Sequence, residues 1–140
     1  MYLPRCLHRA GSWLAASALA AGVVNAPHAT AATPQELLSG YVTQAGTPAN
    51  PGRGQQFFTT RHGQEWSCSS CHGQVPTQTG KHATTGKTIA ALAPAVNAER
   101  FTDPAKVEKW FRRNCKDVVG RECTAAEKAD VLSWLVTLKF

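Results

Sequence analysis

The sequence is organised around residues 66–72, which read Trp-Ser-Cys-Ser-Ser-Cys-His. Cys68 and Cys71 are separated by two residues, and His72 follows directly. On one helical turn both thiols point the same way, so they can form thioether bonds to the two vinyl groups of one porphyrin. His72 then lies beneath the iron as its proximal ligand. The stretch predicts covalent attachment of one haem, with a zinc site or a redox dithiol as the alternatives.

The N-terminal segment has the composition of a secretory signal peptide. Arg5 and Arg9 make its start positive, and residues 13–24 form an apolar run that is too short to span a bilayer. Residues 29–31, Ala-Thr-Ala, offer a small-X-small cleavage site. We therefore expect residues 1–31 to be removed on export. A short membrane anchor is the alternative, but no second apolar segment or charged stop follows.

The remaining residues, 32–140, are enough for one domain. Removing Arg5 and Arg9 lowers the formal net charge from +6 to +4. This charge is too weak and too scattered to indicate nucleic-acid binding. We expect no membrane span in the mature chain.

The cysteine count becomes simple once the signal peptide is removed. Cys6 precedes the apolar run and leaves with it, so four cysteines remain, an even number that suits an oxidising compartment. If Cys68 and Cys71 hold haem, only Cys115 and Cys123 are left to pair. A disulfide between them closes a loop of about nine residues, for which the chain-entropy model gives ~2.6 kcal/mol of stabilisation.

Local signals predict where the helices begin. Capping boxes stand at Thr33 and Thr124, and Asn50 and Asp103 are capping residues followed by proline. We therefore predict an all-α fold with three to five helices around one covalent haem. Residues 73–97 have little helical or strand periodicity, so we expect a long irregular loop that is ordered by the haem rather than by a core of its own.

The helix predicted after Asp103 has an unusual apolar face. Val107, Trp110, Phe111, Asn114 and Val118 recur at helical spacing and share this face. A carboxamide buried among apolar side chains costs roughly 1 to 3 kcal/mol unless its groups are satisfied. The carboxamide of Asn114 should therefore have a bonding partner. Trp110 and Phe111 beside it are candidates to line a haem pocket.

The opposite face of the same helix is basic. It carries Lys106, Lys109, Arg113 and Lys116, with Arg112 beside them. The simplest interpretation is a solvated helix face. The sharper alternative is a docking patch for an acidic redox partner.

The sixth iron ligand can be approached by elimination. Met1 is the only methionine and leaves with the signal peptide, so His/Met coordination is excluded if cleavage occurs as predicted. His62 lies only ten residues before His72 on a segment tethered by Cys68, so the chain would have to wrap tightly for it to reach the far side of the haem. His82 lies on the long loop and is free to reach that side. Asn97 follows Pro94 by three residues, and this proline and the chain after it suggest a turn. The residues alone leave open Asn114, His82, His62, a lysine, and a distal position without a protein ligand.

Short stretches in the second half of the chain carry a family resemblance. They are Thr85-Gly86-Lys87, Leu92-Ala93-Pro94, Arg100-Phe101-Thr102-Asp103, Val107-Glu108-Lys109, Asn114-Cys115 and Gly120-Arg121-Glu122-Cys123. On these residues the chain resembles the sphaeroides haem protein (SHP) family of monohaem c-type cytochromes, related to cytochrome c double-prime, from about Thr33 to Leu138. The resemblance implies a class I-like cytochrome c fold and a periplasmic location.

The resemblance also implies residue roles. They are thioether formation by Cys68 and Cys71, proximal ligation by His72, distal ligation by Asn114, and a disulfide between Cys115 and Cys123. Cytochrome c double-prime has a histidine at the position of Asn114, and that histidine detaches on reduction. The asparagine in this chain therefore argues against a bis-histidine state.

These inferences predict a haem protein with a redox-gated distal asparagine. In the ferrous state it would bind oxygen, nitric oxide or carbon monoxide, and it would exchange electrons with a redox partner, for which the resemblance suggests a dihaem cytochrome. The alternatives are a simple electron-transfer cytochrome and a small haem oxidoreductase, either a peroxidase or a nitric oxide or nitrite reductase. No second acid-base group is placed by a motif, so a dedicated enzyme is the less favoured class.

Overall fold

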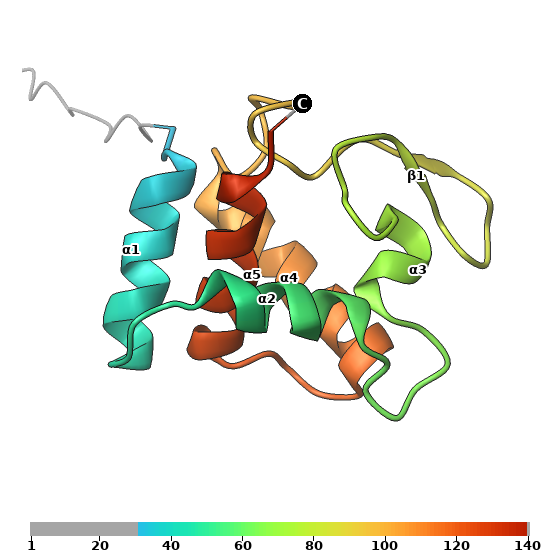
Figure 1. Ribbon diagram of the computed structural model, residues 1–140, viewed down its shortest axis with the longest axis horizontal. Coiled ribbons are helices and arrows are strands. Elements are labelled where there is room, and N and C mark those ends of the chain that lie inside the picture. Colours follow the sequence, from blue (N-terminus) through green and yellow to red (C-terminus); the bar gives the residue numbers. More distant parts are fainter. Residues whose placement is uncertain (1–30, 140) are drawn as a thin grey trace, which may run out of the picture.

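A computed structural model describes residues 31–139, and within them the chain is mainly helical (Figure 1). Its elements are α1 (Pro34–Ala45), α2 (Pro51–Thr59), α3 (Cys68–His72), β1 (Gly80–Lys81), β2 (Thr88–Ile89), α4 (Pro104–Val119) and α5 (Ala125–Thr137). The predicted all-α class is confirmed. No helix in this part of the chain is long and apolar enough to cross a bilayer. Residues 1–30 of the predicted signal peptide lie outside the described residues.

The predicted helix starts are also confirmed. Thr33 and Thr124 form capping boxes with Glu36 and Glu127, and the side chains of Asn50 and Asp103 accept hydrogen bonds from the first turns of α2 and α4. These bonds satisfy amide groups that a helix leaves without an internal partner. Local sequence is therefore sufficient to start each of the four longer helices in the described chain.

The core forms where α5 packs against α1 and α2. Residues 129–135 of α5 are all buried. Gly54 allows α2 to approach α5 closely, because a Cβ at this position would overlap the backbone carbonyl of Asp130. Phe58, only 2% exposed, then packs on Trp134 with ring centroids 5.1 Å apart.

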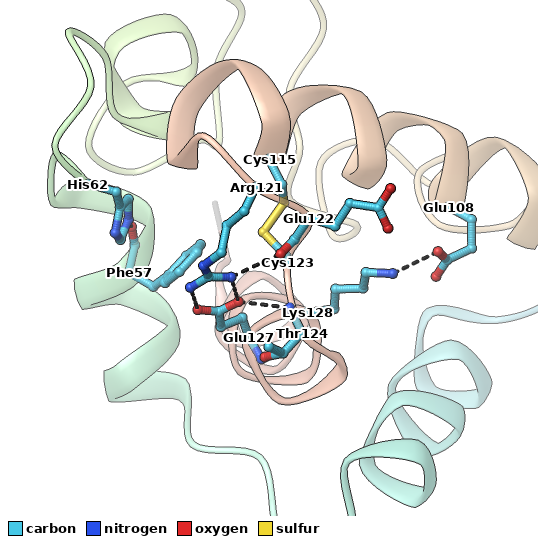
Figure 2. Close-up of a disulfide and its surroundings, with 10 residues drawn as sticks. All are labelled: Phe57, His62, Glu108, Cys115, Arg121, Glu122, Cys123, Thr124, Glu127 and Lys128. Atoms are coloured by element: carbon cyan, nitrogen blue, oxygen red, sulfur yellow. Dashed lines mark hydrogen bonds and ion pairs between the residues drawn. A yellow bond between two sulfur atoms is a disulfide. The ribbon is translucent and has the colours of Figure 1, made fainter.

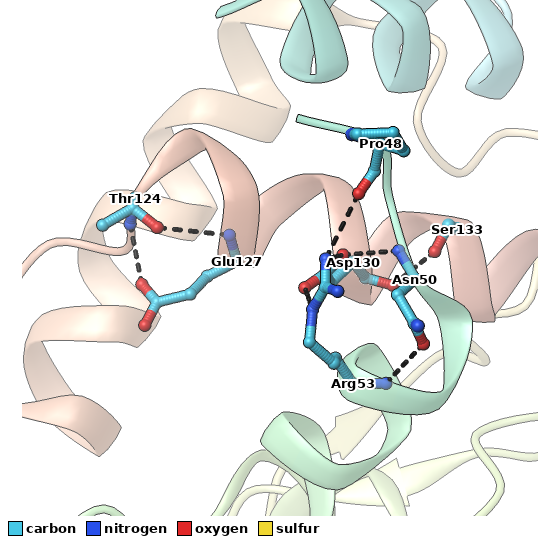
Figure 3. Close-up of polar contacts among 7 residues, drawn as sticks. All are labelled: Pro48, Asn50, Arg53, Thr124, Glu127, Asp130 and Ser133. Carbon is cyan, nitrogen blue, oxygen red and sulfur yellow. Dashed lines mark hydrogen bonds and ion pairs between the residues drawn. The ribbon is translucent and has the colours of Figure 1, made fainter. Parts of the chain in front are cut away.

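An ion pair between exposed Arg53 and buried Asp130 joins the start of α2 to α5 (Figure 3). Arg53 donates from Nε to Asp130 Oδ2 at 2.7 Å and from Nη2 to Asp130 Oδ1 at 2.9 Å. The backbone amide of Asn50 donates to the same carboxylate at 2.6 Å. Since Asp130 is buried, these bonds supply the partners that its charge requires.

Helix α4 runs behind α5 in Figure 1 and makes few close backbone contacts with the other helices. Val107 and Phe111 reach the core formed by Tyr41 and Leu132. Next to them, Glu108 accepts hydrogen bonds from Tyr41 Oη at 2.6 Å and from Lys128 Nζ at 2.7 Å. The first half of α4 is thus joined to α1 and α5 by a partly buried polar cluster.

The long loop has more internal order than the sequence predicted. Strands β1 and β2 pair in antiparallel register, Gly80 with Ile89 and Lys81 with Thr88. On either side of the two strands, the carbonyl of the buried residue Pro76 accepts hydrogen bonds from the amides of Leu92 (3.0 Å) and Ala93 (3.1 Å). The expectation that only the haem would order this loop is corrected, because its two ends hold each other.

We predict that Gly54→Ala destabilises the holoprotein by roughly 1 to 3 kcal/mol, because the added methyl group overpacks the crossing of α2 and α5. Gly40→Ala in α1 is the matched control: nothing lies within 4 Å of its Cβ position. Alanine there should stabilise the helix by about 0.5 to 1 kcal/mol. Urea unfolding followed by circular dichroism measures both changes. Equal stability of the two variants would contradict the close approach at Gly54.

Candidate functional site

Helix α3 presents the two motif thiols. Ser67 caps it, and the backbone amide of Ser67 donates to Ser70 Oγ at 3.0 Å. Cys68 and Cys71 are half-buried free thiols. Burial raises the pKa of Cys68 to about 11, so this thiol is protonated at neutral pH. The helix therefore holds two unpaired thiols one turn apart, as thioether formation to a single porphyrin requires.

His72 ends α3 and is also half-buried. Burial, followed by the positive charge of Arg100, lowers the pKa of His72 to about 4. Its imidazole is therefore neutral at pH 7, which is the form that binds iron. The ring centroid of Phe58 lies 6.1 Å from that of His72, so the imidazole borders the hydrophobic core.

The loop packs tightly against α3. A Cβ at Gly80 would overlap the carbonyl oxygen of Cys71, which makes glycine necessary where β1 passes the helix. The amide of Ala83 lies 3.3 Å from Cys71 Sγ. Arg100 donates to the carbonyls of Ala90 at 2.8 Å and Ala91 at 2.9 Å, and so fixes the far end of the loop. The sequence predicted no role for Arg100, because these bonds join residues that are 9 and 10 positions apart in a segment without periodicity.

The apolar face of α4 is only partly covered by protein. Val107 is buried and Phe111 half-buried, whereas Trp110 is 43% exposed. Asn114 is exposed rather than buried as expected, and among residues 31–139 no protein group hydrogen-bonds its carboxamide. The partner that the sequence required for Asn114 is therefore not another part of the described chain.

The residues present fit a haem. The large apolar side chains that are exposed in the described chain are Val75, Val96 and Trp110, which come from the loop after α3 and from α4. A flat apolar macrocycle with a metal at its centre would cover such side chains and offer a bond to the Asn114 oxygen. Two thiols and a neutral imidazole would supply the attachment and one ligand for a c-type haem, and the Asn114 carboxamide offers a further oxygen donor.

The other candidate distal residues have local roles. His62 Nε2 lies 2.8 Å from the carbonyl oxygen of Phe57, and the rings of the two residues are tilted by 39° with centroids 4.3 Å apart. His82 Nδ1 accepts from two amides of its own turn, at 3.3 Å each. Asn97 accepts from the amide of Glu99 at 3.3 Å, which confirms the predicted turn. Asn114 alone among these candidates lacks such a local bond within the described residues.

The predicted disulfide between Cys115 and Cys123 is present, with Cα atoms 5.6 Å apart (Figure 2). It ties the end of α4 to the short connection that leads into α5. In that connection Arg121 donates to both carboxylate oxygens of Glu127, at 2.8 and 2.6 Å. Cys115, the residue after Asn114, is thus held by a covalent bond. The segment that carries Cys123 is held by the ion pair between Arg121 and Glu127.

Two other sites can be set aside. No group of three or more His, Cys, Asp and Glu side chains in residues 31–139 is arranged to share a metal ion, so the zinc alternative lacks its further ligands. A surface groove of about 840 Å³ lies between α2 and the start of α5. It is lined by Phe57 and His62 but includes neither motif cysteine, so it is separate from the candidate site.

In comparisons with known proteins, the chain is similar to c-type cytochromes. A family model described as a domain of unknown function (DUF1924) matches residues 44–135. The cytochrome c-type protein SHP of Cereibacter sphaeroides is 49% identical over 107 residues, covering 74% of this chain and 82% of that protein. Cytochrome c'' of Methylophilus methylotrophus is 46% identical over 80 residues, covering 57% of this chain and 56% of that protein.

Solved structures show the same relationship. Oxidised SHP, described as an oxygen-binding cytochrome c, matches with a TM-score of 0.72 and 46% identity, covering 76% of this chain and 97% of that one. Oxidised cytochrome c'' from Methylophilus methylotrophus matches with a TM-score of 0.69 and 36% identity, covering 76% and 95%.

We predict that the ion pair beside the disulfide stabilises the protein in a pH-dependent way. Hydrogen bonds from Arg121 hold the pKa of Glu127 below its ordinary value. A lowered carboxyl pKa contributes stability above the ordinary value of about 4.3 and loses it as the pH falls through the folded-state value. Arg121→Gln should therefore lower the unfolding free energy at pH 7, and the difference from wild type should vanish toward pH 3.

Arg113→Gln is the matched control for this pH series. The Arg113 side chain is two-thirds exposed and its Nε lies 4.0 Å from Asp117, so its removal should change stability little at any pH. Urea unfolding between pH 3 and pH 7 measures both variants. A difference for Arg121→Gln that stays constant over this range would contradict the role of Glu127 ionisation.

Proposed function

The chain belongs to the sphaeroides haem protein family of monohaem c-type cytochromes and carries covalent haem c, and from this premise we propose that Asn114 is a redox-gated distal residue. The haem supplies an iron that cycles between ferric and ferrous states and binds diatomic molecules when ferrous. Cys68 and Cys71 hold it through thioethers, and His72 is the proximal ligand. We place the protein in the periplasm, which suits both the predicted signal peptide and the disulfide.

The environment of Asn114 carries this proposal. Its carboxamide is exposed beside the exposed ring of Trp110, on a face of α4 that other helices leave largely uncovered. The helix is nevertheless fixed at Glu108 and at Cys115, on either side of this residue. Because α4 is fixed on both sides of Asn114, this side chain could bind or release an iron without a movement of the backbone.

The chemistry of the donor explains the gating. The carboxamide oxygen of Asn114 is a hard, neutral donor, which prefers ferric to ferrous iron. Asn114 would therefore hold reduced iron more weakly than oxidised iron, and rotation of its side chain would let an external ligand take its place. Oxygen, nitric oxide and carbon monoxide are the diatomic molecules that this position suits. The oxygen binding described for SHP supports this assignment.

An ordinary electron carrier is the second candidate function. The exposed cations of α4 favour it, because they could dock an acidic redox partner. The two functions share electron exchange and differ in whether the ferrous protein takes up an external ligand.

We predict that the ferrous protein binds carbon monoxide, because Asn114 leaves the distal position on reduction. Absorption spectra of the dithionite-reduced protein, recorded with and without carbon monoxide, measure this as a shift of the Soret band. The ferric protein under the same gas serves as control and should show no shift. A ferrous spectrum that carbon monoxide leaves unchanged would sink the gating proposal and favour the electron carrier.

We predict that Asn114→His converts the ferric protein to a low-spin spectrum, because imidazole is a stronger-field ligand than a carboxamide. Lys109→His introduces the same side chain on the solvated face of the same helix and should leave the spectrum unchanged. Electron paramagnetic resonance at low temperature distinguishes the spin states. Identical spectra for Asn114→His and wild type would mean that residue 114 does not face the iron.

A further inference from the structure

One buried phenol makes a hydrogen bond that neither haem attachment nor ligand binding uses. Tyr41 of α1 is 5% exposed and is the only tyrosine among residues 31–139. Its Oη donates to Glu108 Oε1 on α4 at 2.6 Å. The phenolic proton therefore lies beside an acidic side chain, at a distance over which a proton can be transferred.

Glu108 is able to accept this proton. Burial by itself would raise the pKa of Glu108, but its hydrogen bonds with Lys128 and Tyr41 and the charge of Lys128 lower the pKa below its ordinary value. The side chain is therefore a carboxylate at neutral pH, and its Oε2 accepts from Lys128 Nζ at 2.7 Å (Figure 2). Because the Glu108 side chain is 40% exposed, a proton that it takes up can pass on to water.

The surroundings of the Tyr41 ring require the proton to leave when the ring is oxidised. Lys128 Nζ lies 5.5 Å from the centre of this ring. A phenol that loses only an electron becomes positively charged, and the ammonium group of Lys128 would repel that charge. If the proton moves to Glu108 at the same time, the ring stays neutral. Oxidation of Tyr41 is therefore coupled to proton transfer to Glu108.

Phe111 connects the Tyr41 ring with the residues that hold the haem. The two rings meet edge-on, with centroids 5.9 Å apart. Phe111 also packs against the core cluster that contains Phe58 and Trp134, and Cys68 packs against the same cluster. Since Cys68 carries the haem, this cluster borders the cofactor. Packed side chains of this kind let an electron pass between Tyr41 and the haem without a layer of water between them.

From this geometry we propose that Tyr41 is an internal electron donor to the haem, which acts when the ferric protein meets a hydroperoxide. Reduction of a hydroperoxide to water and an alcohol, or of hydrogen peroxide to two waters, breaks the O–O bond and takes two electrons and two protons. One electron comes from the haem and one from Tyr41. The Tyr41 proton goes to Glu108, and solvent supplies the other protons. The inference requires the covalent haem and goes beyond the binding of diatomic ligands.

Electron paramagnetic resonance of the ferric holoprotein, frozen shortly after mixing with hydrogen peroxide, tests the proposal. Wild type should give the signal of a neutral tyrosyl radical, and growth on ring-deuterated tyrosine should narrow that signal. Since Tyr2 lies in the predicted signal peptide, a tyrosyl signal of the mature protein belongs to Tyr41. Tyr41→Phe should lose the signal, and peroxide should bleach its haem faster, because the oxidising equivalent then stays on the porphyrin.

Two variants separate the proton acceptor from the structural role of the cluster. Glu108→Gln and Lys128→Met both break the ion pair between these residues, so both should unfold at lower urea than wild type. Glu108→Gln also removes the base and should slow radical formation roughly a hundredfold, the lower end of what a positioned base contributes. Lys128→Met keeps the carboxylate beside Tyr41 and removes the nearby positive charge, so its radical should form at least as fast as in wild type.

The results can overturn the proposal in two ways. A wild-type sample without a tyrosyl signal, or with a signal that only deuterated tryptophan narrows, would mean that Tyr41 gives no electron to the haem. This measurement decides even if a variant does not fold. Equal slowing in Glu108→Gln and Lys128→Met would mean that Glu108 does not take up the proton. Carbon monoxide binding by the ferrous protein tests the gating of Asn114 separately, and none of these outcomes alters it.

Discussion

The geometry of the candidate site depends on how α4 is held. Glu108 joins the first half of this helix to Tyr41 on α1 and Lys128 on α5, and the Cys115–Cys123 disulfide joins its end to the connection before α5. Hydrogen bonds to a charged group contribute about 1.5 to 3 kcal/mol each, and the disulfide contributes a similar amount by restricting the unfolded chain. Since the other helices make few close backbone contacts with α4, these attachments and the Val107 and Phe111 packing determine where its apolar face points.

The two halves of the site are supported by different parts of the fold. His72 and the motif cysteines sit on α3, which is positioned by the core residue Phe58 and by the loop that passes at Gly80. Asn114 sits on α4, whose attachments lead to α1 and α5 instead. A haem bound between them would add a connection to the core cluster around Phe58 and Trp134, against which both Cys68 and Phe111 pack. Its attachment should therefore add to the cooperativity of folding as well as to chemistry.

The features that sequence predicted well are those that depend on neighbouring residues. Helix starts at Thr33 and Thr124 require a partner only three residues away, and the disulfide followed from counting cysteines. The Glu108 cluster was missed because its partners lie 67 and 20 residues away along the chain. Order in the long loop was missed for the same reason: it comes from Pro76 meeting residues 92 and 93.

Asn114 shows how a sequence pattern can identify a residue while misjudging its surroundings. Helical periodicity placed it correctly on the apolar face, but periodicity describes which residues share a face and not what covers that face. The protein covers Val107 and leaves Trp110 and Asn114 exposed. Because the next residue, Cys115, is fixed by the disulfide, a shift of the whole helix is opposed, and the motion left to Asn114 is rotation about its own side-chain bonds. The proposed gate would therefore depend on the difference in ligand affinity between the two oxidation states, and not on a movement of the backbone.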